Sequence, residues 1–258
     1  MSQVDVPLVR TGFGQTRRAD NWWVQPLFVF LGLSTFIVYS TWAALQGQHF
    51  RFGPYLSPFY SPELFGSADA WFGANPKWLP AWVTAAMLIL WAPGGFRVTC
   101  YYYRGAYYKA FWADPPSCTV GEPRKKYLGE RSFPLIIQNI HRYFLYLALV
   151  FLVILSYDVW KATQFDNGFG IGVGTLVLLA NVILLSCYTL GCHSLRHLVG
   201  GMLDRLAQRP IRKKTYDCVS CLNRRHMIFA WCSLFSVGFS DLYVRMCSMG
   251  IWTDWRLF

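Results

Sequence analysis

The stretch VQPLFVFLGLSTFIVYSTWAAL (Val24–Leu45) contains no charged residue. A membrane-spanning helix needs about 20 predominantly apolar residues, so this run is long enough to cross the hydrocarbon core of a bilayer. Trp22 and Trp23 precede it directly, and aromatic side chains of this kind prefer the boundary between lipid and water. We therefore predict that the first element of the chain is a transmembrane helix.

Four further apolar runs follow the first. The predicted spans cover residues 24–45, 78–104, 133–157, 167–199 and 222–250. Pro93-Gly94-Gly95 is expected to kink the second. Only 14% of the 258 residues are charged, against about 25% in an ordinary soluble domain. The sequence thus predicts an all-α integral membrane bundle of five transmembrane helices, built as a single domain over residues 1–258.

Lys and Arg are distributed unevenly over the connecting segments. The segment before the first span carries three, residues 97–131 carry seven, and residues 196–225 carry eight; with Arg142 this gives 19 on one side against five on the other. Basic loops remain in the cytoplasm, so the N-terminus is predicted to be cytoplasmic and the C-terminus outside. The same bias explains the net charge of +11, and no nucleic-acid partner is expected. The polar segment before the first span does not have the form of a signal peptide.

Four of the five histidines are predicted to lie at one depth, near the cytoplasmic face. A helix rises about 1.5 Å per residue, which places His141 roughly nine residues into the third helix. His226 reaches a similar depth if the fifth helix begins near Asp217. The same layer would also contain His193 and His197 near the inner end of the fourth helix, with Cys192, and Cys100 if the second helix continues past Arg97. Such convergence favours a shared cofactor over four separate packing residues.

Two cofactors suit this layer, and the residues alone leave both open. Imidazoles on facing helices are axial ligands of b-type haem, whereas two His with two Cys fit a Rieske-type [2Fe–2S] centre. The outer halves of the spans contain no histidine, so a second haem near the outer face is not expected. The pair Cys218-Val-Ser-Cys221 has the spacing of a metal or redox motif, but only His226 is near it in sequence.

Charged residues within apolar runs are costly and are often functional. Arg142 follows His141 and is a candidate contact for a cofactor, a quinone oxygen or a partner's carboxylate; the aromatic group Tyr101, Tyr102 and Tyr103 is a candidate lining of a quinone pocket. The competing interpretations are a snorkelling arginine and an interfacial aromatic belt. Asp241 and Arg245 are spaced i, i+4 in the fifth helix. They predict either a local ion pair or part of a proton path.

Several stretches together resemble one protein family. They are WWVQP (22–26), TWAALQ (41–46), SPFYSP (57–62), TCYYYRGAYYKAFW (99–112), FPLIIQNIHRYF (133–144) and LGCHSLRHLVGG (190–201). The chain resembles the cytochrome-b-like, SdhC-type membrane anchors of actinobacterial complex II, and more closely those of mycobacterial succinate dehydrogenase 1 (type F). The resemblance covers most of the chain.

The resemblance implies a subunit of succinate:quinone oxidoreductase, multi-pass in a bacterial plasma membrane. It implies partnership with a flavoprotein subunit that oxidises succinate and a subunit with three iron–sulfur clusters, and it allows a higher oligomer. Electrons would pass to menaquinone through a membrane-embedded Rieske-type [2Fe–2S] centre. The ligands carried over are Cys100, Cys192, His141 and His226, with His193 and then His197 as substitutes.

Three alternatives stay open. One is an anchor with a single b haem, one is a structural anchor without a redox cofactor, and one is a transporter whose histidines relay protons.

Overall fold

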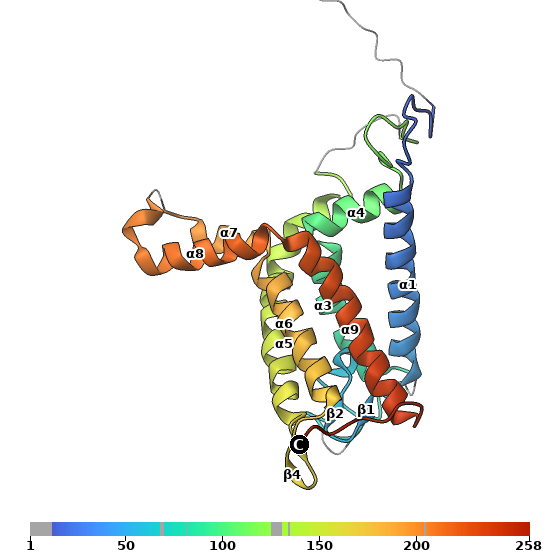
Figure 1. Ribbon diagram of the computed structural model, residues 1–258, viewed down its shortest axis with the longest axis vertical. Helices are drawn as coiled ribbons and strands as arrows, with labels where there is room; N and C mark the ends of the chain where they lie inside the picture. The colour runs from blue at the N-terminus through green and yellow to red at the C-terminus, as the bar shows by residue number, and fades with distance from the viewer. Residues whose placement is uncertain (1–11, 68–69, 81, 125–130, 134, 204) are drawn as a thin grey trace, which may run out of the picture. The chain divides into compact units, whose positions relative to one another are not determined.

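The computed structural model describes residues 12–258, apart from residues 68–69, 81, 125–130, 134 and 204. The described chain is mostly helical (Figure 1). Its elements, in chain order, are α1 (Val24–Gln46), β1 (Arg51–Phe52), β2 (Tyr55–Leu56), η1 (Pro58–Tyr60), α2 (Ala85–Ile89), α3 (Trp91–Val98), α4 (Tyr101–Phe111), η2 (Leu135–Ile140), α5 (His141–Lys161), β3 (Gln164–Phe165), β4 (Gly168–Phe169), α6 (Val173–Leu190), α7 (His193–Gly200), η3 (Leu206–Gln208), α8 (Pro210–Asn223) and α9 (His226–Ser248).

The chain forms two compact units. The first contains the described residues of Met1–Thr35 and Thr99–Gln138, and the second contains Phe36–Val98 and Asn139–Phe258. In the first unit, the guanidinium of Arg18 donates hydrogen bonds to Ser117 Oγ (2.8 Å) and to the carbonyl oxygen of Cys118 (3.0 Å). These bonds hold the segment before α1 against the loop that follows α4.

Four helical segments among the described residues are long and apolar enough to cross a membrane. They are Val24–Gln46, Leu135–Lys161, Val173–Leu190 and His226–Ser248, with mean hydropathies of 1.7, 1.9, 2.0 and 1.5. They match four of the five predicted runs, and α1 matches its predicted bounds almost residue for residue. The presence of apolar helices at these places is therefore confirmed.

The second predicted run, 78–104, is not one helix. It contains α2, α3 and the start of α4; α2 and α3 are separated at Leu90, and Pro93-Gly94-Gly95 lies inside α3. The chain also breaks at Cys100, whose backbone is extended (φ −64°, ψ 130°). The prediction of a continuous helix past Arg97 was wrong, because an apolar pattern does not report the conformation of one residue.

Two other predicted helices are also divided. The chain turns at Gly191 and at Cys192 (φ −66°, ψ 140°), so 167–199 becomes α6 and α7. Residues 222–250 begin in α8, and α9 starts only at His226. The carbonyl oxygen of Gly191 accepts a hydrogen bond from Asn223 Nδ2 (2.8 Å), which compensates one backbone group left unpaired by the break.

Two histidines also differ from their predicted positions within the helices. His141 and His226 do not lie about nine residues into their helices, as a rise of about 1.5 Å per residue suggested. Each is instead the first residue of its helix, α5 or α9. The sequence pattern counted the preceding turns, η2 and the end of α8, as part of the span.

Four helices of the second unit, α3, α5, α6 and α9, pack into a bundle (Figure 1). α6 packs along α9 and against α5, and α5 also packs against α3. Gly95 allows the approach of α3 to α5, because a Cβ at this position would overlap the ring of Phe144. Small residues at helix contacts are typical of membrane bundles, where close packing replaces the hydrophobic effect.

One end of this bundle, which we call the sheet end, contains the β1–β2 and β3–β4 hairpins. Asp254 organises it: its carboxylate accepts hydrogen bonds from Tyr55 Oη (2.8 Å), Tyr243 Oη (2.7 Å) and the backbone N–H of Gly174 (2.9 Å). Burial, together with this carboxylate, raises the pKa of Tyr55 to about 12. The C-terminal segment is thereby attached to the first turn of α6.

A fully buried ion pair also lies at the sheet end. Arg245 Nε is 3.3 Å from Asp241 Oδ2, and both side chains are 0% exposed. Asp241 also accepts hydrogen bonds from Tyr39 Oη (2.6 Å) and Ser57 Oγ (2.5 Å). Arg245 donates to the carbonyl oxygen of Gln48 (2.9 Å), just past the end of α1. The predicted local ion pair is present, and the proton-path alternative stays a prediction.

Replacing Asp241 by Ala should destabilise the protein strongly, since it leaves the Arg245 guanidinium buried without its counter-ion. We expect the free energy of unfolding to fall by about 3–5 kcal/mol. Asp217→Ala is the matched control, because Lys213 and Asp217 form an exposed i, i+4 pair (3.8 Å) worth less than about 1 kcal/mol. SDS-induced unfolding in detergent micelles measures both, and equal losses would contradict a structural role for the buried pair.

Gly95→Ala should also destabilise the second unit, because the new methyl group must displace the Phe144 ring. Overpacking of this kind costs about 1–3 kcal/mol. Gly94→Ala, on the same helix, is the control, since a Cβ there has nothing within 4 Å. The double variant Gly95→Ala/Phe144→Leu should recover most of the loss in a thermal melt. A Gly94 variant as unstable as the Gly95 variant would show that the helix, not the contact, is sensitive.

Candidate functional site

All four predicted ligands lie at junctions between elements. Cys100 directly precedes α4 and Cys192 directly precedes α7, each in an extended backbone conformation. Both cysteines are almost fully buried, at 3% and 1% exposure. His141 and His226 begin α5 and α9. The thiol and imidazole groups therefore lie where helices begin. Backbone N–H groups at these places have no partner within the helix.

The structure brings two of the four into direct contact. His141 Nε2 lies 3.1 Å from Cys192 Sγ, and both residues are buried. His226 belongs to the same unit, whereas Cys100 belongs to the first unit. Within the described parts of the chain, no three His, Cys, Asp or Glu side chains form a group that could hold a metal ion.

His141 and His226 are connected by a chain of four rings. His141 stacks on Phe96 with ring centroids 4.7 Å apart, and His226 stacks on Tyr188 at 4.9 Å. Phe96 and Tyr188 meet edge to face at 5.5 Å. We call this group the ring chain; it joins α3, α5, α6 and α9 at the end of the bundle opposite the sheet end.

Arg97 places a cation beside the ring chain. Its guanidinium carbon lies 4.8 Å from the centre of the Tyr188 ring, and its Nη2 donates to Ser233 Oγ (3.0 Å). Its Nη1 donates to the carbonyl oxygen of Ala230 (3.3 Å). These bonds tie α3 to α9 and leave a fixed positive charge at the edge of the bundle interior.

The substitute ligands are less enclosed. His193 and His197 are exposed on α7, with their Nε2 atoms 3.0 Å apart and their rings edge to face. Cys218 and Cys221 are exposed, free thiols on α8. Figure 1 shows α7 and α8 as a helical hairpin that leaves the bundle where α6 ends.

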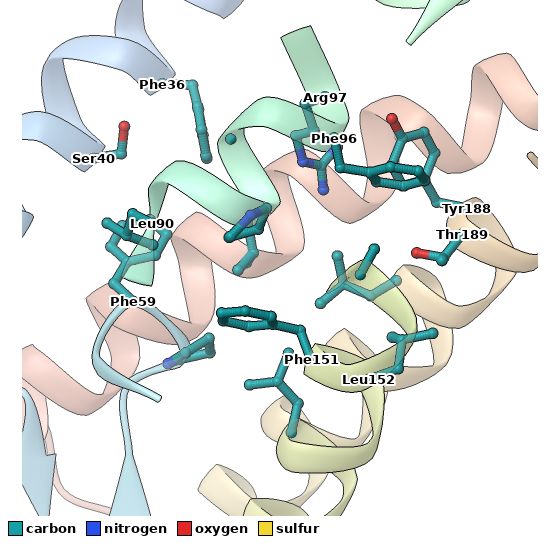
Figure 2. A pocket seen from close by; sticks show the side chains of 17 residues that line it. Phe36, Ser40, Phe59, Leu90, Phe96, Arg97, Phe151, Leu152, Tyr188 and Thr189 are labelled. Carbon is teal, nitrogen blue, oxygen red and sulfur yellow. The ribbon is translucent and has the colours of Figure 1, made fainter. Parts of the chain in front are cut away.

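A cavity of about 160 Å³ lies in the second unit and shares a wall with the ring chain (Figure 2). Phe96, Arg97 and Tyr188 line one part of it, and Phe151 and Leu152 of α5 line another. The remaining lining is mostly apolar, with Ser40 and Thr189 as hydroxyl groups. An apolar cavity with a few polar groups is typical of sites for small hydrophobic ligands.

The other predicted site residues lie apart from this cavity lining. Arg142 is exposed on α5, next to buried His141. Tyr101 is 57% exposed and Tyr103 is buried, and both belong, with Tyr102, to the first unit. Asp241 and Arg245 lie at the sheet end, so they are far along α9 from His226.

Sequence reasoning missed Phe96, Arg97 and Tyr188. Arg97 was counted only as a basic residue of a connecting segment, and the two aromatic residues look like ordinary members of apolar runs. No spacing relates them to the histidines, since the four rings come from four helices. The one signal in the sequence is that these residues lie close to the helix ends that carry the predicted ligands.

The residues present suit an iron–sulfur centre in their chemistry. Thiol sulfur and imidazole nitrogen are the ligands of a Rieske-type cluster. His141 and Cys192 offer one of each, buried and already in contact.

Comparison with known proteins agrees with this architecture. The family described as actinobacterial succinate dehydrogenase subunit SdhC matches residues 24–250. A chain of the Mycobacterium smegmatis Sdh1 complex in the apo form is 42% identical, with a TM-score of 0.88 over 94% of this chain and 94% of that chain. No curated protein matches. The chain therefore belongs to the family of actinobacterial succinate dehydrogenase SdhC subunits.

Proposed function

We propose that this chain is the membrane anchor that carries electrons from the iron–sulfur subunit of succinate dehydrogenase to menaquinone. The observation that carries the proposal is the buried contact between His141 and Cys192 beside the ring chain. Imidazole and thiol are ligand types of redox centres, and Phe96, which stacks on His141, also lines the mostly apolar cavity. The flavoprotein that oxidises succinate would be a separate subunit.

Cys100, Cys192, His141 and His226 would hold a Rieske-type [2Fe–2S] centre, which supplies one-electron transfer when bound. Each of these donors lies directly before a helix or is the first residue of one. Haem between His141 and His226 is less suited, since Phe96 and Tyr188 fill the space between these two rings.

The cavity in Figure 2 supports a quinone as substrate. A menaquinone ring is flat and apolar and carries two carbonyl oxygens. Phe96 and Phe151 offer apolar surface, while Arg97 and Thr189 offer donors for those oxygens. Phe96 touches both His141 and the cavity, so substrate and ligand would be separated by a single ring. Arg142 and Tyr101 to Tyr103 remain candidates for contacts along the entry route.

We further propose five membrane crossings in a bacterial plasma membrane, with the N-terminus cytoplasmic. The second crossing would be made by residues 78–104, in which α2, α3 and the start of α4 form the helical part. The ring chain then lies near the cytoplasmic face. Exposed basic residues of α8, such as Lys213 and Lys214, would face an acidic surface of the soluble iron–sulfur subunit.

A structural anchor without a redox centre is the second candidate. It is favoured by one observation: among the residues that the structure describes, no three potential metal ligands come together. In that case His141 and His226 would serve only as packing residues that stack on Phe96 and Tyr188.

Spectroscopy of the purified, dithionite-reduced complex separates these functions. We expect a Rieske-type EPR signal and no reduced haem α-band in the optical spectrum, because imidazole and thiolate ligands give that cluster its raised potential. A sharp α-band would identify a haem anchor instead. If neither signal appears, the structural anchor is correct.

Replacing both His141 and His226 by Ala should lower the rate of quinone reduction at least about 100-fold. Mutating a residue that only hydrogen-bonds to a metal ligand already lowers activity about 10–100-fold, and loss of the ligands themselves should cost more. Succinate oxidation by an artificial dye should persist, because it needs only the soluble subunits. Cys192→Ala should behave in the same way. Cys232→Ala is the control, since Cys232 is exposed on α9. Quinone reduction that survives in the double variant would contradict the ligand assignment.

A further inference from the structure

A second cavity lies at the sheet end, between the β1–β2 hairpin and the last turns of α5. Its volume is about 380 Å³. A water molecule takes up about 30 Å³ of liquid volume, so the space is large enough for a small polar molecule. The cavity beside the ring chain has one charged side chain in its lining, Arg97, whereas this cavity has four: Arg51, Glu63, Asp158 and Lys161.

The two acidic residues of this cavity are held in place. Glu63 is 3% exposed and accepts from Arg51 Nη2 (2.7 Å), from Ser67 Oγ (3.0 Å) and from the Ser67 N–H (3.2 Å). Asp158 accepts a hydrogen bond from Ser61 Oγ. The lining therefore contains two cations and two carboxylates and carries no net charge. A ligand that matches it carries both a negative and a positive group.

The cavity also lies at a defined depth. Lys161 is the last residue of the candidate membrane span Leu135–Lys161, so the lining residues of α5 lie at one end of that span. Trp71, Tyr157 and Trp160 line the cavity and are 57%, 49% and 57% exposed. Tryptophan and tyrosine are enriched at this boundary because their rings are amphipathic. This position holds whichever side of the membrane the sheet end faces.

We propose that this cavity binds the zwitterionic headgroup of a phospholipid. Lys161 and Arg51 contact the phosphate, and Asp158 contacts the ammonium group, which gives charge-assisted hydrogen bonds at both ends. The carbonyl groups at the C-terminus of α5 add a partial negative charge that also favours the ammonium group. The acyl chains then lie along the exposed surface of α5 below Trp160. The site is separate from the ring chain and needs no redox cofactor.

Native mass spectrometry of the purified membrane complex tests the proposal. We expect wild-type complex to retain a phosphatidylethanolamine-type lipid and Lys161→Gln to retain about tenfold less, because one charge-assisted contact is lost. Lys77→Gln is the matched control, because Lys77 is also an exposed lysine but does not line the cavity. Equal lipid retention in the two variants would overturn the proposal. Since Lys161 is exposed, its variant should fold, and Asp158→Asn provides a second variant that should also lose lipid.

The source and charge of the ligand follow from thermal melts of delipidated complex. Short-chain phosphatidylethanolamine should raise the melting temperature of wild type and of Lys77→Gln, but not of Lys161→Gln. Inorganic phosphate alone should give no rise; an equal rise would show a free-anion site and overturn the lipid assignment. Short-chain phosphatidylglycerol, which has no ammonium group, should protect less. Equal protection by the two lipids would overturn the role of Asp158.

Discussion

The buried pair of Asp241 and Arg245 is the interaction on which the sheet end of the protein depends. Two charges at 0% exposure are stable only when their remaining hydrogen-bonding groups are satisfied. Tyr39 and Ser57 donate hydrogen bonds to the carboxylate of Asp241. Arg245 donates to the carbonyl oxygens of Ala43, in the last turn of α1, and of Gln48, just past its end. The last carbonyls of a helix have no partner within the helix, so this arginine supplies what α1 lacks. One ion pair thereby joins α9, α1 and the loop before η1, and the hairpins of the sheet end are built around that junction.

The opposite end of the bundle is organised by rings and breaks rather than by charge pairs. α3, α5, α6 and α9 each contribute one member of the ring chain, and Arg97 fixes α3 to α9 beside it. In the sequence, the breaks at Cys100 and Cys192 come just after α3 and α6, the helices that carry Phe96 and Tyr188. Within a bilayer such breaks are tolerated only where the protein supplies partners for the exposed backbone groups, as Asn223 does for Gly191. Each of the two helix breaks therefore also places a cysteine thiol in the protein interior.

The two cavities reflect this division of the molecule. The one beside the ring chain is mostly apolar and borders the residues suited to redox chemistry. The one at the sheet end is lined by balanced charges and exposed aromatic rings at the end of α5. α5 connects them, since Ala148 and Leu155 line the first and Asp158 and Lys161 line the second. A lipid bound at the sheet end would thus stabilise the helix whose first residue is His141.

The sequence by itself determined the class of the protein and the positions of its apolar helices, because a run such as Val24–Leu45 has no stable alternative to a helix in lipid. It also singled out His141, Cys192 and His226, since polar residues in such runs are few. Only the tertiary structure decided where the helices break, that His141 meets Cys192, and that Phe96, Tyr188 and Arg97 lie between and beside the histidines. Hydrophobicity is a property of a window of neighbouring residues, so it can be read from the sequence directly. A single extended residue such as Cys100, or a contact among four helices, depends on partners far away in the chain and leaves no periodic signal.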